Sequence, residues 1–307
     1  LFAENFFKVI ENKEPTTKNY MPLIHSNFKY HQGDPASKVE PGDKKVIVIT
    51  DGLAEQKNLN AMVDRFKRSF SKDIEVVNLN ELDIKGGCLG CIHCGFDNIC
   101  VYQDKDEFVE FFTTKVLSAD ILIFAGAIKD RYLSSKWKLF FDRSFFRTHQ
   151  PGLGGIQVGF IISGPLTQLP NVKEIFKSYV EWQRGNLVDF ITDEYEESSH
   201  IDELLQNLAK RLVDLSDKKY IKPVTFRGVG GMKVFRDDIW GNLRFVFQSD
   251  HKFYKKHGLY DFPQKNNKVK AFNRIMMALT TIPFIRKEFP KRIKNEMIKP
   301  LQKILKD

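Results

Sequence analysis

All four cysteines of this 307-residue chain lie within a run of thirteen residues. They are Cys88, Cys91, Cys94 and Cys100, with the spacing C-x2-C-x2-C-x5-C. Thiols this close cannot pair freely as disulfides, because each bridge needs suitable Cα separations and side-chain directions. A compact run with two-residue spacers is typical of the ligands of an iron–sulfur cluster. The run therefore predicts one-electron chemistry.

Other uses of the four thiols stay open. Zinc sites usually take two pairs of ligands separated by a longer spacer, which this run does not have. A redox dithiol would leave two of the thiols unexplained. Ferredoxin runs that serve two clusters carry a proline after the last cysteine, whereas Val101 follows here and no second set exists. The iron–sulfur interpretation is favoured, with one cluster per chain.

The elements that must position this run follow a regular alternation. Short β-branched segments suit strands buried on both faces, and apolar residues at helical spacing lie between them. Five strands alternating with five helices predict an α/β fold, a doubly wound parallel sheet covered on both faces. The expected strands are 45–50, 74–79, 119–125, 156–163 and 187–192, and the helices 58–70, 107–117, 137–146, 172–184 and 201–215.

Doubly wound sheets bind ligands outside the carboxyl ends of their strands, where the strand order reverses. In the order 2-1-3-4-5 that point lies between the first and third strands. The segment Thr50–Asn58 follows the first strand and opens a helix, whose free N–H groups suit a phosphate. G-x-G-x-x-G is absent, so we predict a mononucleotide phosphate rather than a dinucleotide. The cysteines follow the second strand, and we expect their loop beside the same crevice.

These motifs resemble a known family, the iron–sulfur flavoproteins within the flavodoxin-like NAD(P)H-dependent FMN reductases. The resemblance covers roughly residues 45–217, and the cysteine spacing is its most specific part. It rests on Gly87-Cys-Leu-Gly-Cys-Ile-His-Cys94, Cys100, the acidic pair Asp104 and Asp106, Ala119-Asp-Ile-Leu-Ile-Phe124 and Tyr132-Leu-Ser-Ser-Lys-Trp-Lys-Leu-Phe-Phe-Asp-Arg143.

The resemblance implies a 4Fe–4S cluster on the four cysteines and an FMN in three loops. It implies electron transfer between a reduced donor, NAD(P)H or ferredoxin, and an acceptor, in a homo-oligomer where cluster and flavin of neighbouring subunits approach each other. No catalytic acid or base is identified. The implied FMN residues are Thr50, Asp51, Asn58 and Leu59 at the phosphate, with Ala127, Ile128, Tyr132, Leu133, Ser134, Ser163 and Gly164 around the ring.

Two loops depart from the family pattern. The phosphate loop reads Asp51-Gly52 and then Lys57-Asn58-Leu59, where the family usually has Ser-Pro-Arg followed by Gly-Asn-Thr. The ring loop begins Gly126-Ala127-Ile128 rather than with proline and an aromatic residue. Tyr132 is expected either to stack on the flavin or to join the core, and Trp137 is expected in the core.

Three regions follow from composition: an irregular extension over 1–43, the α/β domain over 44–217 and a C-terminal extension over 218–307. The net charge of +9 belongs to residues 264–307, which hold 12 Lys/Arg and 3 Asp/Glu. This basic amphipathic tail suits an anionic membrane surface, an acidic partner, or packing on its own domain. Nucleic acid is not expected, because no recognition motif accompanies the charge. A glycine cluster at Gly228, Gly230 and Gly231 predicts a tight turn.

The first ten residues have no basic start and no small-residue cleavage site, and no stretch of about 18 apolar residues occurs. Together with the single cysteine cluster, this predicts a cytoplasmic protein. Two other functions remain open at this point. One is an NAD(P)H-dependent flavin or quinone reductase without a cluster, and the other is an electron carrier held at a membrane surface by the basic tail.

Overall fold

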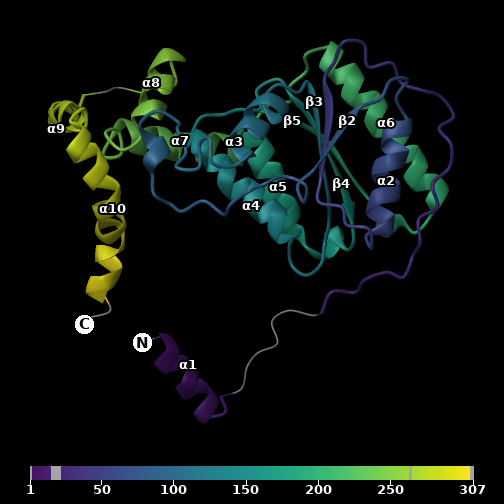
Figure 1. Ribbon diagram of the computed structural model, residues 1–307, viewed down its shortest axis with the longest axis horizontal. Helices are drawn as coiled ribbons and strands as arrows, with labels where there is room; N and C mark the ends of the chain where they lie inside the picture. Colours follow the sequence, from purple (N-terminus) through teal and green to yellow (C-terminus); the bar gives the residue numbers. More distant parts are fainter. Residues whose placement is uncertain (1, 15–21, 263–264, 305–307) are drawn as a thin grey trace.

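The computed structural model describes residues 2–14, 22–262 and 265–304. Its centre is a parallel five-stranded sheet in the order β2-β1-β3-β4-β5 (Figure 1). This order confirms the predicted flavodoxin-like α/β fold, with its switch point between β1 and β3. The strands are β1 (Val46–Thr50), β2 (Glu75–Asn78), β3 (Ile121–Ala127), β4 (Gln157–Ser163) and β5 (Asn186–Thr192).

Two helical layers explain why the central strands are apolar on both faces. Every residue of β1 and β3 is buried, as expected for parallel strands covered on both sides. α2 (Lys57–Arg68) and α6 (Ser198–Asp217) pack on one face of the sheet. The other face carries α4 and α5 and a large aromatic core (Figure 1). The helices of that layer are α3 (Phe108–Phe111), α4 (Ser135–Arg143) and α5 (Pro170–Trp182).

Short irregular turns complete the α/β domain. The helix expected over 107–117 is α3 continued by a π-helical turn, η2 (Phe112–Val116). The other expected helices are found within a few residues of their predicted bounds. The 3-10 turns are η1 (His93–Gly95), η3 (Ser144–Arg147), η4 (Leu166–Gln168) and η5 (Asp193–Tyr195).

The N-terminal extension is not wholly irregular, which corrects the sequence prediction. Residues Phe2–Glu11 form α1, an amphipathic helix whose aromatic residues recur at helical spacing. The later part of the extension packs on the α2–α6 face, where Tyr30 is buried in the core. Residues 1 and 15–21 of the predicted extension lie outside the described ranges.

The C-terminal extension, residues 218–307, folds into helices with a small core of their own. That core contains Ile239, Val246, Phe247 and Tyr254. The basic tail packs on it, since the Asn273 side chain donates to a backbone carbonyl in the extension. The helices are α7 (Phe226–Trp240), α8 (Gln248–Lys256), α9 (Asn267–Leu279) and α10 (Pro283–Ile304). Residues 264 and 305–307 of the predicted tail lie outside the described ranges.

The glycine cluster lies inside α7, so the predicted tight turn is wrong. A Cβ atom on Gly228 would lie 2.8 Å from the Cγ of Glu181, and one on Gly231 would lie 3.3 Å from the Trp182 side chain. The glycines therefore let α7 approach the end of α5 closely. In the described part of the chain, we find no helix with the length and apolar character to cross a membrane.

Candidate functional site

The four cysteine side chains line one narrow cavity. Cys94 is buried, Cys91 and Cys100 are half-buried, and Cys88 is exposed. All four predicted cluster ligands are thus brought together. The rest of the wall is mainly apolar and aromatic: Leu89, Ile92, Val101, Tyr102, Arg143, Phe145 and Phe146. We call this the cysteine cavity.

The electrostatics of the cavity show how close the thiols are. Burial, together with smaller contributions from the neighbouring Cys88, Cys100 and Cys91, raises the pKa of Cys94 to about 12. Like charges disfavour ionisation, so this thiol keeps its proton in the absence of a cation. A bound metal centre reverses that preference, because its own charge stabilises the thiolates.

Among the described residues, no three His, Cys, Asp or Glu side chains converge closely enough to hold one metal ion. A cluster is larger than an ion and holds its thiolates further apart, on several metal atoms. The cavity is only about 20 Å³. Cys88 and Leu89 are its exposed lining residues.

Arg143 closes the two ends of the cysteine loop, which we define as residues 86–106. Its guanidinium donates to the backbone carbonyl of Gly86 (2.9 Å) and to both carboxylate oxygens of Asp106 (2.7 and 2.9 Å). The side chains of the pair are 1% and 0% exposed. Although burial alone would raise it, the hydrogen bonds from Arg143 hold the pKa of Asp106 below its usual value. The end of α4 thus fixes the loop.

The loop backbone is unusual between its ends. Gly90, Ile92 and Asn98 have φ values of 60°, 57° and 61°. The left-handed region is a genuine outlier for a β-branched residue such as isoleucine. Ile92 keeps this conformation while its side chain packs against the core of the C-terminal extension. Such conformations persist when the surroundings enforce them, and they concentrate at functional sites.

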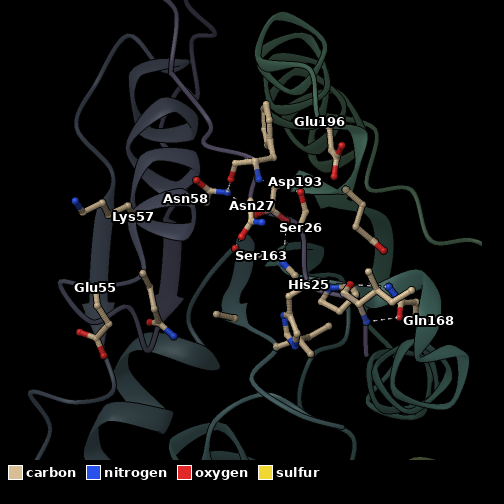
Figure 2. Close-up of a pocket in the computed structure, with 18 residues that line it drawn as sticks. His25, Ser26, Asn27, Glu55, Lys57, Asn58, Ser163, Gln168, Asp193 and Glu196 are labelled. Atoms are coloured by element: carbon tan, nitrogen blue, oxygen red, sulfur yellow. Dashed lines mark hydrogen bonds between the residues drawn. The ribbon is translucent and has the colours of Figure 1, made fainter. Parts of the chain in front are cut away.

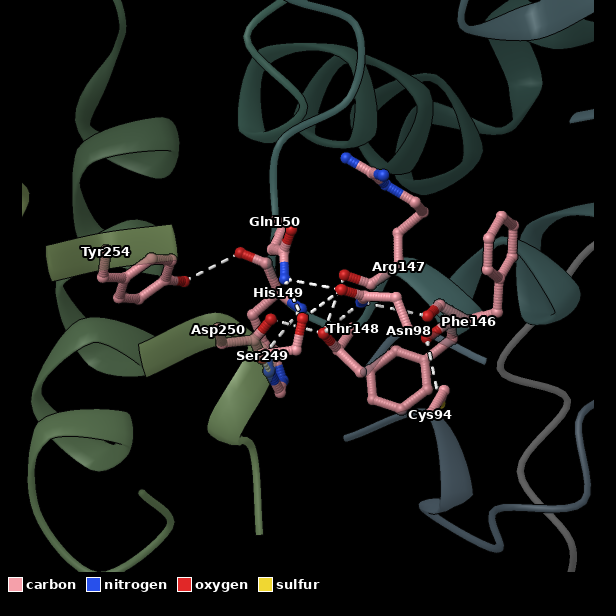
Figure 3. A network of polar contacts seen from close by, with 11 residues as sticks. Cys94, Asn98, Phe146, Arg147, Thr148, His149, Gln150, Ser249, Asp250 and Tyr254 are labelled. Carbon is pink, nitrogen blue, oxygen red and sulfur yellow. Dashed lines mark hydrogen bonds and ion pairs between the residues drawn. The ribbon is translucent and has the colours of Figure 1, made fainter. Parts of the chain in front are cut away.

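A buried polar network joins the loop to the C-terminal extension (Figure 3). Gln150 donates to Asn98 (2.9 Å) and to Ser249 of α8 (2.7 Å). The carboxylate of Asp250 lies 2.8 Å from Nδ1 of His149 and accepts a hydrogen bond from the Thr148 hydroxyl. No local sequence pattern indicates these contacts, because they join residues about a hundred positions apart. The extension is therefore part of the cysteine site.

A second and larger cavity of about 470 Å³ lies at the carboxyl ends of the strands (Figure 2). We call it the edge cavity, and its size falls in the range of ligand pockets. It includes five of the predicted FMN residues, Asn58, Ala127, Ile128, Ser163 and Gly164. The remaining lining residues are Ile24, His25, Ser26, Asn27, Phe28, Glu55, Gln56, Lys57, Pro165, Gln168, Asp193, Glu194 and Glu196.

Asp193 organises one side of the edge cavity, and sequence reasoning missed it. Its carboxylate accepts hydrogen bonds from Asn58 Nδ2 (2.9 Å), the Ser163 hydroxyl (2.7 Å) and the Gly164 N–H (2.8 Å). The Asn58 amide also donates to the backbone of Phe28. The side chain of Asn58 is thus committed to the protein. The position of Asp193 directly after β5 was the available signal.

The N-terminal segment also lines the edge cavity, which no sequence signal indicates. The backbone of Ile24 exchanges two hydrogen bonds with the Gln168 side chain (3.0 and 2.9 Å), as Figure 2 shows. Tyr30 and His31 continue this attachment through Asp202 and Ser198 of α6. Residues 24–28 therefore form one wall of the cavity, and Tyr30 and His31 anchor the segment to α6.

The first turn of α2 lies at one end of the edge cavity. Its leading N–H groups have no partner within the helix, and Lys57 lies at this turn. Leu59 can contribute only its backbone, because its side chain is fully buried in the core. Thr50 is likewise buried, 6% exposed, and does not line the cavity.

Asp51 is a buried carboxylate at the switch point itself. It is 1% exposed, and neither carboxylate oxygen has a hydrogen-bond partner of normal geometry among the described residues. Ser134 and Trp137 lie near it. Burial raises the pKa of Asp51, and the neighbouring hydroxyl and indole N–H offset only part of that effect.

The rest of the predicted ring loop packs inward. Tyr132 lies against Phe176, with ring centroids 5.8 Å apart, and burial raises its pKa to about 12. Leu133 belongs to the same apolar core. Ser134 caps α4 by accepting from the N–H of Lys136. Trp137 is fully buried, as predicted.

The edge cavity and the cysteine cavity do not share a wall. The edge cavity contacts Ala127 and Ile128, before α4, whereas the cysteine cavity contacts Arg143, Phe145 and Phe146, at its far end. No described residue lines both. α4, nine residues and about 13 Å long, separates the two sets of lining residues along the chain.

No family model and no curated protein matches the chain. Among solved structures, RosB with a bound 8-demethyl-8-formylriboflavin-5'-phosphate is 14% identical, with a TM-score of 0.46 over 64% of this chain and 87% of that one. The Trp repressor binding protein from Bacillus subtilis is 17% identical, with a TM-score of 0.36 over 55% and 97%. The flavodoxin of Streptococcus pneumonia TIGR4 is 16% identical, with a TM-score of 0.34 over 55% and 96%. All these scores are below 0.5, so the fold assignment rests on the strand order itself.

Proposed function

We propose that this protein is an oxidoreductase that binds FMN in the edge cavity and one 4Fe–4S cluster on Cys88, Cys91, Cys94 and Cys100. The observation that carries the proposal is the convergence of every thiol in the chain on one mainly apolar cavity. A bound flavin supplies two-electron and one-electron chemistry, and a bound cluster supplies one-electron chemistry.

The residues of each cavity fit these groups. In the edge cavity, the first turn of α2 with Lys57 suits the phosphate, and Ile128 and Pro165 offer an apolar wall for the ring. At the cysteine cavity, Arg143 ties the two ends of the cysteine loop together. Because the cavity is only about 20 Å³, the part of the loop between these ends would have to move outward to hold a cluster. These residues bind and orient, and we assign no acid or base.

The separation of the two cavities bears on electron transfer. A donor, NAD(P)H or ferredoxin, would reduce the protein, and electrons would pass between flavin and cluster. Because α4 lies between the cavities of one chain, the proposal favours a homo-oligomer in which the cysteine cavity of one subunit approaches the edge cavity of another.

Anaerobic purification followed by visible spectroscopy and iron and sulfide analysis tests both cofactors. We expect flavin and cluster absorption in the parent protein and loss of iron without loss of flavin in Cys91→Ser. The matched loop variant His93→Gln, whose ring Nδ1 lies 3.0 Å from the carbonyl oxygen of Ile99, should show no change. A flavin-loaded, iron-free protein containing zinc would instead support the reductase without a cluster.

A second candidate, a carrier held at a membrane surface, is favoured by one observation. α9 and the turn after it expose Phe272, Ile275, Leu279 and Ile282 to solvent beside basic side chains. Sedimentation with anionic liposomes tests this. We expect Ile275→Glu, but not Ala271→Glu, to reduce pelleting, and equal pelleting of both variants would contradict the membrane role.

A further inference from the structure

A third cavity, of about 510 Å³, lies wholly within the C-terminal extension. We call it the basic cavity. α7, α8 and α9 contribute to its wall, and neither proposed cofactor uses it. Its lining residues are Trp240, Arg244, His251, Tyr254, Lys255, Gly258, Tyr260, Lys270, Arg274 and Met277.

The charges around the basic cavity are of one sign. Arg244, Lys255, Lys270 and Arg274 line it, and none of the described lining residues is acidic. Burial, together with smaller contributions from the nearby Arg244 and Lys255, lowers the pKa of His251 to about 4. The histidine is therefore neutral, and it shares a 2.8 Å hydrogen bond with the Tyr260 hydroxyl. Such a surface attracts anions.

Arg244 is the decisive residue, because it is buried without a carboxylate. It is 8% exposed, its side chain donates to the backbone carbonyl of Trp240, and its Nε has no partner among the described residues. The other buried arginines of the described chain, Arg65, Arg143 and Arg236, each pair with an aspartate. Burying an unpaired charge is costly, so an anion that neutralises Arg244 would bind favourably.

Aromatic rings form the remaining wall. The Arg244 guanidinium lies 5.1 Å from the centroid of the Trp240 ring, and the rings of Tyr254 and Tyr260 are 5.9 Å apart. Planar ligands stack on such side chains, and guanidinium groups bind phosphate with paired hydrogen bonds. A ligand that carries both a phosphate and a planar ring is a nucleotide.

We propose that the basic cavity is a nucleotide-binding site in which Arg244 and Arg274 bind the phosphates and the aromatic wall holds the base. The site is independent of the flavin and cluster proposal. It also connects to the polar network of Figure 3, because Tyr254, which lines it, donates its hydroxyl to the carbonyl of His149 (2.8 Å).

Isothermal titration of the full-length protein with ADP, pyrophosphate and adenosine tests the proposal. We expect saturable ADP binding, weaker pyrophosphate binding and weakest adenosine binding. Arg244→Gln should weaken ADP binding about tenfold or more, which is the expected loss of a charge-assisted contact. Arg274→Gln, at an exposed position, should weaken it severalfold with the fold intact. Lys268→Gln, exposed on the same helix but away from the cavity, should match the parent protein.

Three outcomes would overturn the site. The first is no saturable binding of ADP at millimolar concentration. The second is ADP binding that Arg244→Gln and Arg274→Gln both leave unchanged. The third is binding only to vesicles that contain phosphatidylserine. The second outcome would move the nucleotide elsewhere, and the third would assign the cavity to a lipid headgroup. Flavin and iron contents are measured separately, so failure here leaves the cofactor proposal standing.

Discussion

At the scale of single residues, the ion pair between Arg143 and Asp106 is the contact on which the cysteine loop depends. Both side chains are buried, and the guanidinium also holds the carbonyl of Gly86. Removing one member of a buried pair leaves the other charge uncompensated, at a cost of about 3–5 kcal/mol. We therefore expect Arg143→Met to lose about that much free energy of unfolding in urea titrations at pH 7.

The same ion pair makes the free energy of unfolding depend on pH. The pKa of Asp106 is lowered in the folded protein, so its stabilisation is present above the unfolded pKa of about 4 and is lost as the pH falls through the folded value. Urea titrations from pH 7 to pH 3 should show a smaller acid loss in Asp106→Asn than in the parent. Asp104→Asn, exposed on the same loop and tolerant of its left-handed backbone, is the control. Equal acid profiles in all three proteins would contradict this assignment.

For Asp51 we expect the opposite dependence of the free energy of unfolding on pH. Its pKa is raised by burial, so the ionised carboxylate destabilises the fold above its folded pKa, and the penalty vanishes below about pH 4. Asp51→Asn should raise the free energy of unfolding at pH 7 by about 1 kcal/mol, with a gain that shrinks on acidification. The exposed Asp73→Asn should change nothing. A destabilised Asp51→Asn at pH 7 would show that the carboxylate has a stabilising partner.

At the scale of elements, two glycines of α7 allow the effect of helix propensity to be measured apart from the effect of packing. Gly230 has open space around it, since a methyl group added there would have its nearest neighbour 4.0 Å away, so Gly230→Ala should stabilise the protein by about 0.5–1 kcal/mol. At Gly228 the new methyl would displace Glu181, which accepts from the Thr225 hydroxyl at the start of α7 (2.8 Å). Gly228→Ala should therefore gain nothing or lose stability. Thermal unfolding of both variants measures the difference, and equal gains would contradict the close α5–α7 contact.

The elements also show how much could be predicted from sequence. Strands such as Val46–Thr50 carry their own signal, because buried parallel strands are continuously apolar, and the cysteine run is recognisable by its spacing. α7 was missed because three glycines weaken local helix propensity, and only the contact with Glu181 and Trp182 explains them. Asp193 and Asp250 were missed because their partners are distant in sequence, and pairing of that kind leaves no local pattern.

At the scale of the whole molecule, the C-terminal extension and the cysteine loop form one unit. A Cβ on Gly95 would overlap the carbonyl oxygen of Val246, so the two backbones are in direct contact. Arg286 of α10 also pairs with Asp97 and lies over the ring of Phe96. The basic tail is thus bound to the loop that carries the thiols.

Cutting this connection should expose Cys94. Asp250 is fully buried, and its carboxylate is bonded to Thr148 and His149, so Asp250→Ala removes a member of the buried network. If the local stability falls by about 1.4 kcal/mol or more, local opening of the loop becomes about tenfold more frequent. In the metal-free, reduced protein, alkylation of Cys94 followed by mass spectrometry should accelerate about tenfold. The exposed Cys88 should react at its original rate, which serves as an internal control. Asp238→Asn, exposed on α7, should leave both rates unchanged, and unchanged Cys94 reactivity in Asp250→Ala would show that the loop closes without the extension.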